Sequence, residues 1–216
     1  EETAAVQARL SELEAEFRTA IGQRAASVEW RSARALPVPY MLQQARAADI
    51  IVVGARSEAM VDPYAAPDPS DLVMQAGRPL IVVPPAVQWL DLRSVLVAWK
   101  DTREARRAVF DALPILAAAK EVTIAEIPEQ DTDRAEAMSR VADVAAWLRS
   151  HGIVAHTSVP EAAADVSQQL DKIAANVGAG AVVAGAYGHS RFREWVLSGV
   201  TRHLSTESRR CALLSR

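Results

Sequence analysis

Short apolar runs alternate with amphipathic segments along the second half of the chain. Several of the runs are continuously apolar or small, which is typical of parallel strands that helices cover on both faces. Because helical segments lie between them, the pattern predicts right-handed strand–helix–strand units and a parallel sheet. The candidate strands are residues 95–98, 122–125, 153–155, 181–185 and 211–214.

The helices between these strands carry signals at their ends. An aspartate opens three of them, and its short side chain can cap free backbone N–H groups. A glycine closes two of them, where the chain needs a left-handed residue. The predicted helices are residues 101–116, 133–151, 165–177 and one that contains 200–204.

The first half of the chain repeats the end of this pattern. A strand ends at Gly54 as another ends at Gly185, and 25 residues separate Gly54 from Pro79 where 27 separate Gly185 from Ala212. We interpret this as an internal duplication. The segments expected in the first half are strands at 27–30, 50–53 and 80–83 and helices at 1–22, 39–47 and 69–76.

The duplication predicts the domain boundaries. An incomplete, degenerate first copy occupies residues 1–85, a linker 86–91, and a complete second copy 92–216. The first copy lacks a leading strand, helix and strand, and the chain starts inside a helical pattern without an initiator methionine. We therefore expect either that further residues precede Glu1 in the natural protein or that the half-copy packs against the second copy.

Composition narrows the classes of partner. The chain has 216 residues, half of them hydrophobic, so it can build one large core or two small ones. A net charge of −3 gives no basic face for nucleic acid, and no apolar stretch reaches the length of a membrane span. Cys211 is the only cysteine, so no internal disulfide can form. Together with the charged start of the chain, this predicts a cytoplasmic location.

Residues 185–201 carry the strongest functional signal. Gly185 and Gly188 bound a turn after a strand, and Ser198-Gly199 opens the next helix after nine further residues. Glycine lets the backbone approach a ligand, a helix N-terminus offers N–H donors to phosphate, and ligands of open α/β sheets bind at the carboxyl ends of strands. The stretch indicates an anionic ligand such as a nucleotide phosphate. The alternative is a tight turn that needs glycine for its geometry alone.

This stretch resembles the universal stress protein family, whose signature is Gly-x-x-Gly, nine residues, then Gly and Ser or Thr. The final pair is inverted here, as Ser198-Gly199. Residues 94–105, SVLVAWKDTREA, also resemble the family's opening strand and loop, and residues 200–204 its last helix. The resemblance implies an α/β fold with a doubly wound parallel sheet, Rossmann- or flavodoxin-like and of the adenine-nucleotide alpha hydrolase-like type, in two tandem copies.

The resemblance also implies a strand order, a mode of pairing and a site. The complete copy is expected to have the order 3-2-1-4-5, and the two copies to pair within the chain through their last strands as a homodimer would; the whole chain could also form a homodimer. The family's ATP-binding members place phosphate and ribose at positions that here are Gly185, Gly188, Ser198, Gly199 and the Val200 amide. The expected ligand is ATP or another adenine nucleotide with Mg²⁺.

Two departures from the family pattern affect that site. The family has an acidic residue just after its first strand, whereas this chain has Lys100 there and Asp101 one step later. Lys100 either meets a phosphate or is simply solvated. The first copy keeps Gly54 but follows it with prolines and with acids such as Asp68, which would repel phosphate, so we expect no nucleotide there.

No catalytic constellation stands out in the sequence. The four histidines show no metal-ligand spacing, and there is neither a P-loop nor a recognisable Ser–His–Asp arrangement. We therefore expect a stress-response protein with a nucleotide-sensing second copy rather than a dedicated enzyme. The alternatives are an interaction module that works through dimerisation and partner contacts, and a weak nucleotide hydrolase.

Overall fold

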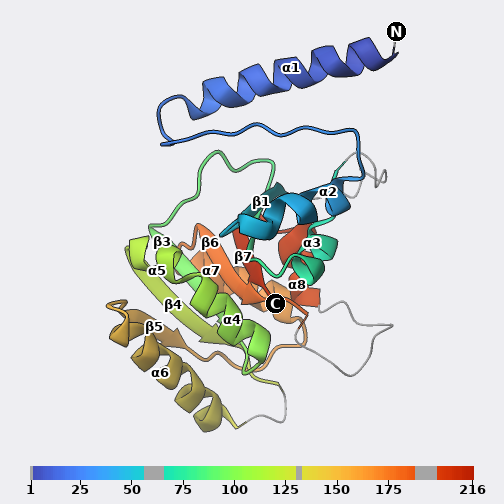
Figure 1. Ribbon diagram of the computed structural model, residues 1–216. Helices are drawn as coiled ribbons and strands as arrows, with labels where there is room; N and C mark the ends of the chain where they lie inside the picture. Colours follow the sequence, from blue (N-terminus) through green and yellow to red (C-terminus); the bar gives the residue numbers. More distant parts are fainter. Residues whose placement is uncertain (1, 56–65, 130–132, 188–198) are drawn as a thin grey trace. The chain divides into compact units, whose positions relative to one another are not determined.

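The computed structural model describes residues 2–55, 66–129, 133–187 and 199–216 (Figure 1). The chain forms two compact units, Glu1–Leu36 and Pro37–Arg216. These units do not coincide with the two predicted copies, because strands from both copies belong to one sheet in the larger unit. The boundaries at 85 and 92 stay a prediction.

The smaller unit, where it is described, consists of α1 (Glu2–Ile21) followed by an extended segment. The helix predicted for residues 1–22 is confirmed. The ring centroids of Phe17 and Trp30 lie 5.4 Å apart, so an aromatic contact holds the segment to the helix. The strand predicted at 27–30 is wrong, because the described residues of this unit offer it no second strand to pair with.

The larger unit is built on a seven-stranded sheet with the order β1-β2-β7-β6-β3-β4-β5. Neighbouring strands are parallel except β2 and β7, which are antiparallel. The part β5-β4-β3-β6-β7 has the order 3-2-1-4-5 when its strands are numbered along the chain, so the predicted order and the doubly wound α/β fold are confirmed. The strands are β1 (Ile51–Gly54), β2 (Leu80–Val83), β3 (Ser94–Trp99), β4 (Glu121–Glu126), β5 (Ala155–Ser158), β6 (Ala181–Gly185) and β7 (Cys211–Ser215).

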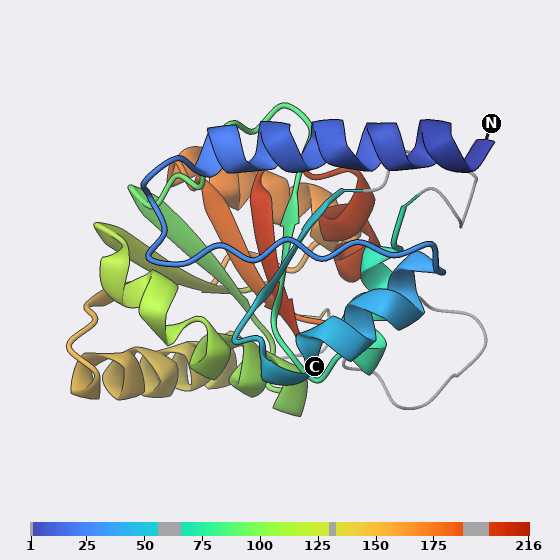
Figure 2. The ribbon, with the colours of Figure 1, turned by 45° about the horizontal axis from the view of Figure 1, so that its top comes forward.

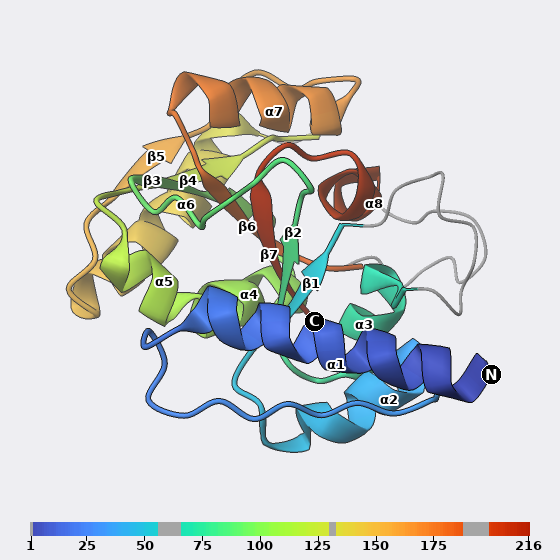
Figure 3. The same ribbon diagram turned by 90° about the horizontal axis from the view of Figure 1, so that it is seen from above.

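The helices of the larger unit pack on both faces of this sheet. They are α2 (Pro37–Gln44), the 3-10 helix η1 (Ala45–Ala47), α3 (Pro69–Gln75), α4 (Arg103–Asp111), α5 (Leu113–Ala118), α6 (Arg134–Ser150), α7 (Val166–Asn176) and α8 (Gly199–Thr206). Helices α4, α5 and α6 share one hydrophobic core, whereas α3, α7 and α8 share the other. Figure 3 shows α4 and α5 on one side of β3 and β6 and α7 on the other side. No helix in the described part of the chain is long and apolar enough to cross a membrane.

The antiparallel ladder between β2 and β7 lies inside the sheet and is centred on the pair Ile81–Leu213. The four strands β1-β2-β7-β6 are arranged nearly symmetrically about this ladder, since β1 precedes its partner residues in β2 by 29 positions and β6 precedes its partners in β7 by 30. The two strands taken from the sequence as the last of each copy meet here. That the first half is a duplicated copy stays a prediction.

Two element boundaries differ from those expected. The helix predicted at 101–116 divides at Ala112 into α4 and α5, because Pro114 lacks a backbone N–H and its ring obstructs the preceding turn. The strand predicted at 153–155 forms later, at Ala155–Ser158. Gly152, with a φ of 79°, reverses the chain after α6, and Ile153 is buried in the core before the ladder begins.

A partly buried ion pair ties α6 to β4. Glu126 is the last residue of β4 and only 5% exposed. Its Oε1 accepts hydrogen bonds from Nε and Nη2 of Arg140 at 3.0 and 2.5 Å. Arg140 Nη1 also lies 3.1 Å from Glu136 Oε1. The guanidinium is therefore held by two carboxylates, one from the sheet and one from its own helix.

This pair predicts a large coupling energy between β4 and α6. We expect Glu126→Ala to lower the free energy of unfolding by about 3 kcal/mol, because the substitution leaves a poorly solvated guanidinium without its main partner. A double-mutant cycle with Arg140→Ala, measured by urea denaturation, should give a coupling of about 2 kcal/mol. The exposed pair Arg134–Glu161, at 3.0 Å, is the matched control and should give less than about 1 kcal/mol. Equal couplings for the two pairs would contradict the assignment.

Candidate functional site

Of the predicted site residues that the structure describes, Lys100, Asp101 and Gly185 lie at the carboxyl ends of two neighbouring strands. β3 and β6 are parallel neighbours, and the chain leaves β3 toward β4 on one side but leaves β6 toward β7 on the other (Figure 2). This reversal of strand order creates a crevice at the carboxyl ends of the two strands. Lys100 and Asp101 follow β3 directly, and Gly185 ends β6. Gly188 and Ser198 lie outside the described residues.

Gly185 is in close contact with the first turn of α4. A Cβ atom there would lie 2.4 Å from the backbone nitrogen of Ala105 and 2.6 Å from the carbonyl carbon of Glu104. Both neighbours are backbone atoms, so neither can turn aside. Helix packing alone therefore requires glycine at this position, whatever ligand the crevice takes.

The chain after Gly185 is held in an unusual conformation. Ala186 donates its N–H to the carbonyl of Ser215 at 2.8 Å, which extends the contact with β7 by one residue. Tyr187 then has a φ of 58°, a left-handed conformation that is rare for an aromatic residue. Its N–H donates to Oγ1 of the buried Thr201 at 3.4 Å. The chain thus turns sharply at the end of β6 and is tied to α8.

The Tyr187 side chain reaches the start of α3. Its hydroxyl is buried and makes no hydrogen bond of ordinary geometry within the described part of the chain. Burial raises the pKa of Tyr187, the Ser70 hydroxyl lowers it, and the carboxylates of Asp68 and Asp71 raise it further. No local pattern in the sequence indicates this contact between the residue after β6 and the α3 N-terminus.

The charged residues after β3 are paired with neighbours. Lys100 Nζ lies 2.6 Å from Glu129 Oε1, and Asp101 forms an ion pair with Arg106. The cap expected at Asp101 is shifted by one residue, because Thr102 caps α4 and its Oγ1 accepts the N–H of Ala105 at 3.2 Å. Asp101 is thereby left at the surface, half exposed.

The N-terminus of α4 already carries a negative charge. Glu104 in its first turn is buried, 3% exposed, and lies 2.5 Å from Arg103 Nε. Burial alone would raise the pKa of Glu104, but the hydrogen bonds from Arg103 and from its own backbone N–H, with the charges of Arg103 and Arg216, hold that pKa below its usual value. An ionised carboxylate at this helix end disfavours a second anion.

Helix α8 has a different start. It opens at Gly199, which is exposed, and among the described residues a Cβ atom there would meet only Ser167 Oγ, at 3.7 Å. Val200 follows, half-buried. A cavity of about 480 Å³ adjoins this helix end, and its lining includes Asp165, Ser167, Gln168, Asp171, Gly199, Arg202, His203 and Glu207.

A histidine in this cavity lies between two carboxylates. His203 Nε2 is 2.8 Å from Asp171 Oδ2, and its Nδ1 is 3.2 Å from Glu207 Oε2. Both ring nitrogens are therefore engaged, and the ring cannot accept a substrate proton without losing one contact. The sequence did not reveal the pair, because Asp171 and His203 come from different helices 32 residues apart. No group of three or more histidine, cysteine or acidic side chains suitable for a metal ion occurs among the described residues.

The corresponding region of the first half differs. Gly54 ends β1 as Gly185 ends β6, but a Cβ atom at Gly54 would meet no atom of the described residues within 4 Å. Asp68, an acid expected to repel phosphate, caps α3 by accepting the N–H of Ser70 at 2.8 Å. Residues 56–65 lie outside the described part of the chain, so the absence of a nucleotide there stays a prediction.

No family model matches this sequence, and neither does any curated protein. Solved structures do match. A universal stress protein from Archaeoglobus fulgidus has a TM-score of 0.74 at 16% identity, over 99% of this chain and 78% of that one. PA1789 from Pseudomonas aeruginosa, whose structure was described as that of a functionally unknown protein, has a TM-score of 0.58 at 18% identity, over 100% and 78%.

A shorter neighbour matches only part of this chain. The universal stress protein UspA from Lactobacillus plantarum has a TM-score of 0.50 at 12% identity, and the match covers 58% of this chain and 98% of that one. That share of 216 residues is about 125 residues, as many as the predicted complete copy at 92–216 holds. The chain therefore has the fold of the universal stress proteins, as the resemblance implied.

The contrast between the two strand-ending glycines gives a test of their roles. We expect Gly185→Ala to lower the free energy of unfolding by about 2–3 kcal/mol, because the methyl group would overlap the α4 backbone. The matched substitution Gly54→Ala should change it by less than about 0.5 kcal/mol, since the space there is open. Urea denaturation followed by circular dichroism measures both. Equal free energies of unfolding for the two variants would show that the α4 backbone is not in close contact with Gly185.

Proposed function

We propose that this chain is a cytoplasmic stress-response protein of the universal-stress-protein type, and that residues 92–216 bind an adenine nucleotide with Mg²⁺ at the crevice between β3 and β6. The proposal is supported by the positions of Lys100 and Gly185, which stand at the ends of the neighbouring strands β3 and β6 where strand order reverses, and by the hydrogen bond from Tyr187 N–H that ties the turn after β6 to Thr201 of α8. Ligands of doubly wound sheets bind at such points.

The phosphate end of the proposed site is α8 rather than α4. The start of α4 is capped by Thr102 and carries the ionised Glu104, whereas α8 opens at an exposed glycine. Backbone N–H groups of Gly199 and Val200 are the expected donors to a phosphate, favoured by the helix dipole. Gly188 and Ser198 complete the proposed contact set, as the sequence resemblance implies.

The charges around this helix end favour a magnesium complex over a bare nucleotide. Asp165, Asp171 and Glu207 line the adjoining cavity, and only Arg202 and His203 among its lining residues can carry a positive charge. Carboxylates repel a bare triphosphate but are compatible with a phosphate whose charge Mg²⁺ partly neutralises. The base end has less support, because Lys100, bound to Glu129, stands where the family has an acid.

The two alternatives from the sequence receive less support from the geometry. An interaction module built on the last strand would need a free β7, but β7 lies between β6 and β2 and all of its residues are buried. A hydrolase would need a general base, and His203 has both ring nitrogens engaged by carboxylates. We therefore place nucleotide sensing first.

Titration calorimetry with ATP–Mg²⁺ tests the proposal on the whole chain. We expect binding near one site per chain with a micromolar dissociation constant. Gly199→Glu should weaken nucleotide binding at least tenfold, because a carboxylate would stand where the phosphate binds. The described residues leave space for this side chain, so the variant should still fold. Gly199→Gln is the neutral control and should weaken binding less.

Two results would overturn this proposal. The first is the absence of heat at millimolar nucleotide with a folded protein, which would direct attention to protein partners. The second is equal affinity for Gly199→Glu and the unsubstituted chain, which would move the nucleotide away from α8.

A further inference from the structure

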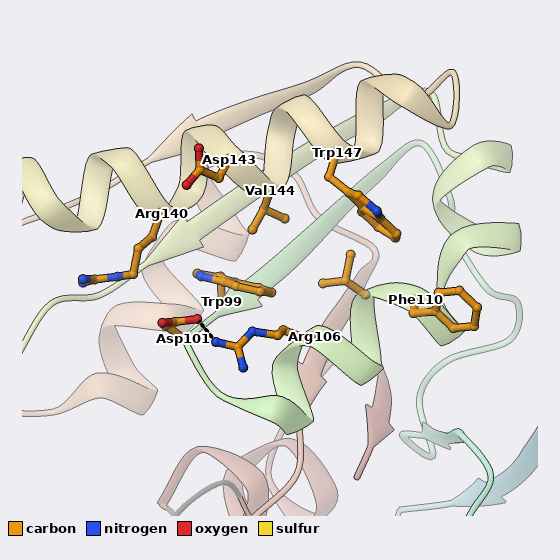
Figure 4. Close-up of a pocket in the computed structure, with 9 residues that line it drawn as sticks. Trp99, Asp101, Arg106, Phe110, Arg140, Asp143, Val144 and Trp147 are labelled. Atoms are coloured by element: carbon orange, nitrogen blue, oxygen red, sulfur yellow. Dashed lines mark hydrogen bonds and ion pairs between the residues drawn. The ribbon is translucent and has the colours of Figure 1, made fainter.

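A second cavity lies on the opposite face of the sheet from α8, between α4 and α6 (Figure 4). Its volume is about 470 Å³, within the range of small-molecule sites. Trp99, the last residue of β3, lies at its centre, and Val144 from α6 points toward that ring. The cavity shares Asp101 with the predicted nucleotide site; its other walls come from α4, α6 and Trp99.

The indole of Trp99, which lines this cavity, carries an unused hydrogen-bond donor that is itself almost fully enclosed. Trp99 is only 8% exposed, and its Nε1–H has no hydrogen-bond partner within the described part of the chain. Buried donors are nearly always paired, so an orphan that lines a cavity points to a missing acceptor. In Figure 4 the ring nitrogen is turned toward the end of the cavity lined by Arg140 and Asp101.

The other end of the cavity is apolar and aromatic. Val109 and Val144 line this end. In Figure 4 Trp147 stands at the rim, and Phe110 lies beyond it with its ring turned away from Trp99. The rings of Phe110 and Trp147 are 58% and 38% exposed, so they leave apolar surface at the rim that a ligand would cover. Aromatic walls of this kind favour a flat ring system over a branched aliphatic one.

The arginines of the cavity do not make it a site for anions. Arg106 is paired with Asp101, and Arg140 is held by Glu126 and Glu136. Asp143 adds another carboxylate to the lining. With both guanidinium groups engaged by carboxylates, a phosphate or carboxylate ligand would gain little attraction.

We propose that this cavity binds an uncharged, planar two-ring heteroaromatic molecule, with an acceptor atom of its ring system taking the hydrogen bond of Trp99 Nε1. The cavity shares only Asp101 with the predicted nucleotide site and none of the proposed phosphate contacts at α8, so either site can fail without the other. Its ligand is recognised by ring stacking at the apolar end and by a single hydrogen bond at the polar end.

Quinoline and naphthalene form a matched pair of probes, since they differ in one ring atom and only quinoline has an acceptor. In a ¹H–¹⁵N spectrum the chain's five tryptophans give separate indole signals, and Trp99→Phe identifies the one of interest. Quinoline should move this signal downfield with a dissociation constant of the order of 1 mM or below. Naphthalene should bind more weakly and leave the Trp99 N–H without a downfield shift.

Variants separate the hydrogen bond from the shape of the cavity. Trp99→Phe keeps an aromatic ring but removes the donor, and should weaken quinoline binding about fivefold to tenfold while leaving naphthalene unchanged. Trp89→Phe, at a position 73% exposed, is the control and should leave both unchanged. Val144→Trp, at a half-buried helix position, should fill the cavity and abolish both even if Trp99→Phe fails to fold.

Three results would overturn the inference. The first is an unchanged chemical shift of the Trp99 indole N–H at 5 mM quinoline. The second is equal quinoline affinity for Trp99→Phe and the unsubstituted chain. The third is displacement of quinoline by ATP–Mg²⁺, which would make the cavity part of the nucleotide site rather than a site of its own.

Discussion

The pairing of β2 with β7 is the interaction on which the larger unit depends. Two short parallel strands such as β1 and β2 cannot bury a core by themselves. By adding to β7 they extend a five-stranded sheet, and Leu80, Val82 and Leu214 become fully buried. The same pairing removes the free edge of β7. The described sheet therefore ends at β1 and at β5, and any partner that adds a strand must do so there.

The glycines of the predicted motif do not carry equal weight once their surroundings are known. Gly185 is required by the backbone of α4, so its presence says little about a ligand. Packing against the described residues does not require glycine at position 199, because among them only Ser167 Oγ would lie near a side chain there. A glycine that packing does not explain is the better indicator of close approach by another molecule. A phosphate is therefore expected at the start of α8 rather than at the end of β6.

Most of the fold could be predicted from the sequence because its signals are local. Continuous apolar runs gave β2 and β6 at their observed limits, and Asp133 and Asp165 cap α6 and α7 as expected. The strand expected at 27–30 failed because a strand needs a partner, which no local pattern can supply. The site was less predictable for the same reason: the engagement of His203 and the unpaired donor of Trp99 depend on residues distant in sequence.

The cavity over Trp99 arises because α4 and α6, which cover the same face of the sheet, pack on different strands. The first turn of α4 is drawn against β6 by the missing side chain of Gly185, and α4 also packs on β7. Helix α6 is drawn the other way, onto β4 and β5, where Glu126 holds Arg140. The strand between these anchors, β3, is left without a helix directly over its end. Trp99, the largest side chain of β3, occupies that gap and does not fill it. Substitutions that shift either anchor should therefore change the cavity before they change the sheet.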